Sequence, residues 1–273
     1  MTDWASCVKE IIQKRLASLA SREEKVHRLR EFLQLVVLQI LSEGGYFQKI
    51  AFVGETALRL LFQLQRYSQD LDFCVTQPDT YEFEKMKKSI ALNFEKLGFD
   101  LYLKPKCEKV IQSLYIRFEN LLYDLDLSPL QDERLSIRIE IDSNPPKGWK
   151  CEMSLINDVF IFPVWHFDLP SLFATKIHAC FFRKFRKGRD YYDLLWYLSK
   201  KIQPNFELLN NAIQQTAKGV HLVGSENFKE FLYEHLQQID FSFIQRDVSP
   251  FLVSPREAEL LNKNLFYDLL RKF

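Results

Sequence analysis

The sequence predicts an α+β fold, in which a mixed sheet with flanking helices is followed by an all-α C-terminal part. Three observations support this prediction. Strand and helix patterns alternate up to about residue 98, β-rich segments follow between residues 99 and 161, and helix periodicity dominates from residue 169 onward. We therefore expect an α/β domain with N-terminal helices over residues 1–165 and a helical domain over residues 166–273.

The first elements alternate between helix and strand. Ser21 and Glu24 form a capping-box pattern before the helical segment REEKVHRLREFLQLVVLQILSE, and Gly44 is a natural stop. A buried strand (KIAFV), a helix directly after Gly54 (ETALRLLFQL) and a second strand (LDFCV) follow. The amphipathic segment TYEFEKMKKSIALNFEKLG predicts a further helix that ends at Gly98.

The middle of the chain has the alternation typical of strands. Its segments are FDLYLK, KVIQSLYIRF, LSIRIEIDSN, CEMSLIN and VFIFPV. Beyond them, LPSLFATKIHACFFRKF, RDYYDLLWYLSK and NFELLNNAIQQTA predict helices, and we expect the remainder to be helical with short breaks.

Composition narrows the class of protein. The 273 residues are 47% hydrophobic and carry a net charge of +1, so a site for a polyanion must be local. The five cysteines lie far apart without a CxxC pair, which favours a reduced, intracellular protein. The N-terminus lacks a secretory pattern and no apolar run has the length of a membrane span, so we expect a cytoplasmic protein without a membrane partner.

Two acids stand in the second strand segment. Asp70 and Asp72 alternate with Leu71 and Phe73, which places both carboxylates on one face. Their repulsion calls for a cation between them, and hard oxygen ligands suit Mg²⁺, with Mn²⁺ as the alternative. The other interpretation is a solvated edge strand. The upstream Arg66 and Ser68 could contact phosphate.

A strand–glycine–helix junction precedes this pair. The helix start after Gly54 offers free N–H groups and the positive end of the helix dipole, and Thr56 adds a hydroxyl. Such a junction can hold a phosphate, although an ordinary turn has the same pattern.

A second pair of acids lies in the segment SIRIEIDSN. Glu140 and Asp142 alternate with isoleucines and therefore share one face. Either one could complete a three-carboxylate metal site with Asp70 and Asp72. A sheet with one polar face is the alternative.

The helical part contributes a lysine, a basic run and two aspartates. Lys176 lies on an apolar helix face, where it needs an anion. Asp190 and Asp193 are one helical turn apart, and Asp190 could equally act as a first-turn acid. The basic run could hold a polyanion or be a solvated helix end, and it comprises Arg183, Lys184, Arg186, Lys187 and Arg189.

In their order along the chain, these features resemble the AbiEii/AbiGii-type toxin nucleotidyltransferases. This family belongs to the superfamily that shares the DNA polymerase beta catalytic fold. The resemblance is carried by GETAL (Gly54 to Leu58), RYSQDLDF (Arg66 to Phe73), IEID (Ile139 to Asp142), and KIHA followed by RDYYDL (Lys176 to Leu194). It implies a polymerase beta-like nucleotidyltransferase sheet domain.

The resemblance also implies roles for individual residues. Asp70 and Asp72 would bind the metal with Glu140 or Asp142 as the third acid. Nucleotide contacts would come from Gly54, Thr56, Arg66 and Ser68. Lys176 and Asp190 would position the nucleotide or act in catalysis, and Arg183, Lys184, Arg186 and Lys187 would bind the acceptor. Glu55 departs from the family pattern, which has a second glycine there.

The expected function is therefore Mg²⁺-dependent transfer of a nucleotide from a nucleoside triphosphate to an acceptor. The acceptor would be RNA, such as the 3′ end of tRNA, or a protein. The resemblance implies the toxin of a toxin–antitoxin or phage-defence pair, with an antitoxin as partner. Two alternatives are a catalytically weak nucleotide-binding module, suggested by Glu55, and a Mg²⁺-dependent nuclease.

Overall fold

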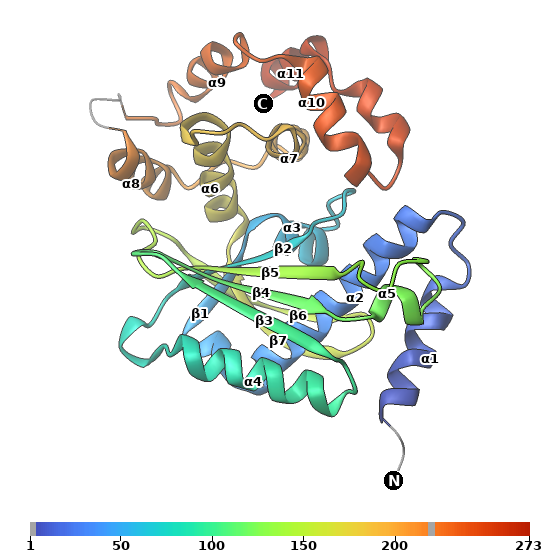
Figure 1. Cartoon of the computed structure of the whole chain (residues 1–273). Helices are drawn as coiled ribbons and strands as arrows, with labels where there is room; N and C mark the ends of the chain where they lie inside the picture. Colours follow the sequence, from blue (N-terminus) through green and yellow to red (C-terminus); the bar gives the residue numbers. More distant parts are fainter. Residues whose placement is uncertain (1–3, 218–221) are drawn as a thin grey trace. The chain divides into compact units, whose positions relative to one another are not determined.

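The computed structural model describes residues 4–217 and 222–273, and the chain divides into two compact units (Figure 1). The sheet unit comprises Met1–Thr56, Ser68–Pro145 and Met153–His166, and the helical unit comprises Ala57–Tyr67, Pro146–Glu152 and Phe167–Phe273. The predicted domain boundary between residues 165 and 166 stays a prediction. In addition to the C-terminal residues, the helical unit includes two short segments from earlier in the chain, which one boundary cannot describe. Residues 218–221 of the predicted helical remainder lie outside the described residues.

Two helices begin the sheet unit. They are α1 (Trp4–Leu16) and α2 (Arg22–Glu43). The Ser21 side chain accepts a hydrogen bond from the Glu24 amide, and Gly44 caps the other end of α2, so the sequence prediction of both helix ends is confirmed. The apolar face of α2 is buried, and a 3₁₀ turn (η1, Tyr46–Gln48) leads into the first strand.

The sheet is mixed and has seven strands in the order β3-β4-β5-β2-β1-β7-β6. The strands are β1 (Ile50–Val53), β2 (Asp70–Val75), β3 (Leu101–Cys107), β4 (Ile111–Phe118), β5 (Leu135–Asp142), β6 (Cys151–Asn157) and β7 (Ile161–Phe167). Strand β2 pairs antiparallel with β1 and parallel with β5, so the predicted mixed sheet is confirmed. Its central position gives β2 a strand neighbour on each side.

Helix α4 (Phe83–Lys96) follows β2 after the 3₁₀ turn η2 (Pro78–Thr80) and lies along the sheet (Figure 1). Phe94 packs edge-to-face on Phe118 of β4, at 5.3 Å between ring centroids. The short helix α5 (Leu121–Asp124) connects β4 to β5 and was not predicted. Along β5, buried aliphatic residues alternate with polar residues that are at least partly exposed, as the sequence indicates.

The helical unit confirms the predicted all-α character of the C-terminal part. Its elements are α6 (Leu169–Phe182), α7 (Gly188–Ser199), α8 (Phe206–Thr216), α9 (Phe228–Leu236), α10 (Phe241–Val248), η3 (Ser249–Phe251), η4 (Pro255–Leu260) and α11 (Lys263–Lys272). Phe173 of α6 stacks on Tyr197 of α7, with ring centroids 4.2 Å apart. Among the described residues, no helix is long and apolar enough to cross a membrane.

Helix α3 (Gly54–Phe62) begins at the end of β1 and continues into the helical unit. The segment after α3 is held by backbone contacts. The Tyr67 amide donates to the carbonyl of Phe251, and Arg66 forms an isolated bridge with Leu252. These contacts explain why residues 57–67 belong with the C-terminal helices.

Candidate active site

The parallel register of β2 and β5 brings the predicted strand acids to one face of the sheet unit. Asp72 pairs with Glu140, and Asp70 pairs with Arg138. Leu71 is buried between the two β2 acids, so Asp70 and Asp72 share the face opposite the core. The alternation expected for both segments is therefore present, and the pairing places Glu140 directly beside Asp72.

Arg138 supplies a cation on this face. Its Nη2 lies 2.6 Å from Asp70 Oδ2, and its Nη1 lies 3.1 Å from Glu140 Oε1. Burial disfavours the guanidinium charge, but the hydrogen bond and attraction to Asp70, with help from Glu140, outweigh it and raise the pKa of Arg138. Sequence reasoning required a cation near the acids but did not name Arg138, although the alternation of SIRIEID places it on the acidic face.

The turn at Gly54 packs against the second acid. Gly54 has a φ of +78°, and a Cβ at this position would lie 3.0 Å from the Cβ and Cγ of Asp72. A glycine is needed here for both reasons. The Gly54 turn, which the sequence suggests as a phosphate site, packs against Asp72 in the described structure.

Two buried hydroxyls hold the same turn to β2. The hydroxyl oxygens of Thr56 and Ser68 lie 2.8 Å apart, and Thr56 also donates to the backbone carbonyl of Asp70. Both side chains are buried, so they fix the helix start rather than face solvent.

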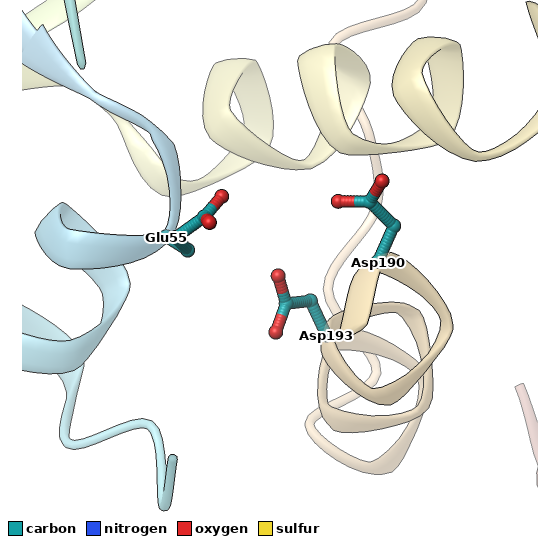
Figure 2. A group of neighbouring side chains, drawn as sticks. All are labelled: Glu55, Asp190 and Asp193. Carbon is teal, nitrogen blue, oxygen red and sulfur yellow. The ribbon is translucent and has the colours of Figure 1, made fainter. Parts of the chain in front are cut away.

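Glu55, the acid that departs from the family pattern, is half-buried in the first turn of α3 (Figure 2).

Asp142 lies one step further along the same face, opposite Cys74. Its Oδ1 accepts a hydrogen bond from the Asn144 amide at 2.8 Å. Burial raises the pKa of Asp142, and this hydrogen bond opposes the shift. Of the two candidate third acids, Glu140 is the neighbour of Asp72 in the register.

The chemistry of this face fits a divalent cation, because it offers carboxylate oxygens on adjacent strands. Among the described residues of the sheet unit, these acids do not bring three oxygens within 4.8 Å of one another. Arg138 bridges Asp70 and Glu140 instead, and its guanidinium compensates their charge.

The helical unit contains a second set of ionised groups, which we call the ion cluster: Arg66, Lys176, Arg183, Asp190 and Asp193. Lys176 Nζ lies 2.7 Å from Asp190 Oδ1 and 2.8 Å from Asp193 Oδ2. Arg66 donates from Nε and Nη2 to the two carboxylate oxygens of Asp193, each at 2.6 Å. Figure 2 shows both aspartates near the start of α7.

Four of the five side chains of the ion cluster are buried. The side chains of Arg66 and Asp193 are 0% exposed, and those of Lys176 and Asp190 are 6% and 4% exposed. Lys176 therefore meets the anion that its apolar position requires. Sequence reasoning placed Arg66 among the nucleotide contacts and did not identify its pairing with Asp193, 127 residues away.

The basic run extends from the C-cap of α6, Arg183, through the connecting loop to the N-cap of α7, Lys187, and Arg189 lies in the first turn of α7. Arg183, Lys184 and Arg186 are exposed, and Lys187 is half-buried. Arg183 Nη1 contacts Asp190 Oδ2 at 3.1 Å, and Arg186 donates to the carbonyl of Gln238 at 3.4 Å. The loop therefore presents a local positive surface on a nearly neutral chain.

A comparison with protein families matches residues 36–263 to the family described as nucleotidyl transferase AbiEii toxin, type IV toxin–antitoxin system. The chain belongs to the AbiEii family. The match includes every candidate residue from Gly54 to Asp193, and it confirms the family that the motifs resemble. As an AbiEii protein, the chain is a nucleotidyltransferase of a toxin family.

Solved structures with a similar fold come from Helicobacter pylori. One, provisionally described as a nucleotidyltransferase, has a TM-score of 0.50 at 16% identity and covers 93% of this chain and 97% of its own. JHP933 has a TM-score of 0.47 at 17% identity and covers 92% of this chain and 96% of its own. The first similarity supports the fold alone. A search of curated proteins found no match.

Proposed function

We propose that this AbiEii protein transfers a nucleotide from a nucleoside triphosphate to an RNA acceptor, such as the 3′ end of tRNA, in a reaction that depends on Mg²⁺. One observation carries the proposal: the β2–β5 register sets Asp72 beside Glu140, with Asp70 on the same face and the Gly54 turn packed against Asp72. A protein acceptor remains the alternative for the second substrate.

Within this proposal, Asp70, Asp72 and Glu140 would hold the metal, with Asp142 as a further acid at the edge of the face. When bound, Mg²⁺, or Mn²⁺ in its place, would neutralise triphosphate charge and polarise the reacting phosphate. The start of α3 would hold phosphate oxygens, because the positive end of the helix dipole lies there. The acceptor hydroxyl would attack the α-phosphorus in line, and pyrophosphate would leave.

The exposed basic loop of the helical unit would contribute positive charge. Lys176 and Asp190 are proposed to act in nucleotide positioning, as the family resemblance implies, indirectly and through the buried ion pairs that they form. The exposed loop with Arg183, Lys184, Arg186 and Lys187 would bind the acceptor backbone, so binding should weaken as salt rises. This division assigns phosphate chemistry to the strand acids and acceptor capture to the loop.

The biological setting follows from the family. AbiEii proteins are described as toxins of type IV toxin–antitoxin systems. We propose that this chain acts in the cytoplasm, where RNA and triphosphates are available, and that an antitoxin and a role in phage defence accompany it.

The direct test is label transfer by the full chain. Purified protein would be incubated with Mg²⁺, each α-labelled nucleoside triphosphate and total RNA, beside the variant Asp70→Asn/Asp72→Asn. We expect labelled RNA from the native protein and about a thousandfold less from the variant. Asp79→Asn, at an exposed position just after β2, is the matched control and should retain activity. Label on protein alone would contradict the RNA acceptor, and equal transfer by the double variant would contradict the metal site.

A further inference from the structure

A polar pocket of about 180 Å³ lies beside Asp70 in the sheet unit, and we call it the Arg30 pocket. Its walls come from α2, from the residue before β2, and from β4 and β5. The lining residues are Arg30, Gln69, Asp70, Tyr115, Ser136 and Arg138. Two guanidinium groups, a phenol and a hydroxyl therefore surround a space that adjoins a proposed metal acid.

Arg30 is the group in this pocket whose charge lacks a close acid. It donates from Nε to the backbone carbonyl of Ser136 at 3.4 Å. Within the described residues, Arg30 forms no ion pair within 4.0 Å, whereas Arg138 is paired with Asp70 and Glu140. Burial lowers the pKa of Arg30, because desolvation outweighs the attraction of Asp70. A partly buried guanidinium of this kind is stabilised when an anion binds it bidentately.

The order of the strands separates the Arg30 pocket from the Gly54 turn. The sheet runs β4-β5-β2-β1, and the turn extends from β1 on one side of the β2 acids. The pocket lies toward β5 and β4 on the other side, at the end of β2 where Asp70 and Gln69 stand. The β2 acids therefore have a candidate phosphate site on each side, the Gly54 turn toward β1 and the Arg30 pocket toward β5.

We propose that the Arg30 pocket binds a phosphodiester group of the acceptor strand next to the attacking hydroxyl. This inference rests on the proposed function, since it assigns the β1 flank to the triphosphate and the β5 flank to the acceptor. Arg30 precedes the residues matched to the AbiEii family, whereas the other lining residues lie within them. A phosphodiester site favours a nucleic acid over a protein as the acceptor.

The test measures binding without turnover. Fluorescence anisotropy would follow a labelled single-stranded RNA oligonucleotide, and separately a fluorescent non-hydrolysable triphosphate, with the native chain and Arg30→Gln. We expect RNA affinity to fall about tenfold, because one charged hydrogen-bonded contact is lost. The slope of log affinity against log salt should decrease by about 0.7, as for one phosphate contact to a single strand. Triphosphate affinity should stay unchanged.

Matched variants separate the pocket from general charge and from folding. Arg28→Gln removes the same charge from the same helix outside the pocket and should retain RNA affinity. Ser136→Asp adds a negative charge at an exposed lining position and should weaken RNA binding as well. Thermal unfolding would establish that each variant is folded. Arg30→Lys would replace an unfolded Arg30→Gln, and because it keeps the charge but loses the bidentate geometry, we expect a smaller loss of RNA affinity and an unchanged salt slope.

The outcomes distinguish this inference from the proposed function. If Arg30→Gln and Ser136→Asp bind RNA as the native chain does, the Arg30 pocket is not an acceptor site, whatever label transfer shows. If they lose triphosphate affinity instead, the pocket serves the nucleotide and the assignment is overturned. Failure of native label transfer would contradict the proposed function while leaving the RNA-binding result as it stands.

Discussion

The acid face of the sheet unit and the ion cluster of the helical unit use the same residue types in opposite ways. On the acid face, Asp70, Arg138 and Glu140 have side chains that are 25%, 28% and 31% exposed. In the ion cluster, Arg66 and Asp193 are fully buried, and Lys176 shares both aspartates. An exposed ion pair contributes little to stability and can be replaced by a ligand, whereas a buried set must stay balanced for the protein to fold.

The largest expected effect comes from breaking the ion cluster. Asp193→Asn leaves Arg66 and Lys176 buried with one carboxylate fewer, and it should lower the free energy of unfolding by about 3–5 kcal/mol. Chemical denaturation would measure this loss. The control is Asp70→Asn on the acid face, which should change stability by less than about 1 kcal/mol. Equal losses of unfolding free energy in Asp193→Asn and Asp70→Asn would contradict the distinction between the ion cluster and the acid face.

The next effect concerns the contact between Gly54 and Asp72. Gly54→Ala places a Cβ against the Asp72 side chain and forces alanine to a φ of +78°, which costs about 1–3 kcal/mol. Because the clash falls on a proposed metal acid, label transfer should fall by about tenfold or more. Gly148→Ala offers a control, since that glycine also has a positive φ but lies against Glu207 in the helical unit. Similar activity losses in both variants would indicate general destabilisation.

A smaller effect is expected at Arg138. Arg138→Gln leaves Asp70 and Glu140 without their shared cation and should lower stability without metal by about 0.5–1 kcal/mol. Added Mg²⁺ should then raise the Tm of this variant more than that of the native chain, because it relieves more repulsion. Arg117→Gln on β4 is the control and should respond to Mg²⁺ as the native chain does. An unchanged or smaller response in Arg138→Gln would contradict the role of Arg138 as the compensating cation.

The smallest effect is a pH dependence near the ion cluster. Burial, and then the charge of Arg183, lower the pKa of His178 below its ordinary value of 6.5. The folded chain therefore binds this proton more weakly than the unfolded chain, and its stability should decrease as pH falls through 6.5. His178→Gln should flatten the stability profile between pH 7 and pH 5. Arg183→Gln should retain most of the dependence, because burial is the larger cause.

Much of the fold could be predicted from local patterns. The capping box at Ser21, the buried strand before Gly54 and the alternation along β5 each depend on neighbours in the sequence, and the structure has all of them. The short helix α5 was missed because four residues give no periodicity.

The strand acids could also be found from the sequence, because alternation fixes the face on which Asp70, Asp72 and Glu140 lie. Long-range partners could not be found in this way. Arg66 meets Asp193 across 127 residues, and Arg30 lines its pocket from a part of α2 to which the sequence assigns no functional motif. Which of Glu140 and Asp142 lies opposite Asp72 likewise depends on a strand register that only the structure supplies.

Metal binding tests the central claim most directly, namely that the acid face and not the ion cluster holds the divalent cation. Electron paramagnetic resonance would follow Mn²⁺ binding to the native chain, to Asp70→Asn and to Asp193→Asn, each well below its own Tm. The account predicts that Asp70→Asn loses Mn²⁺ affinity by at least about tenfold and that folded Asp193→Asn retains it. Native affinity in Asp70→Asn, with loss in Asp193→Asn, would contradict it.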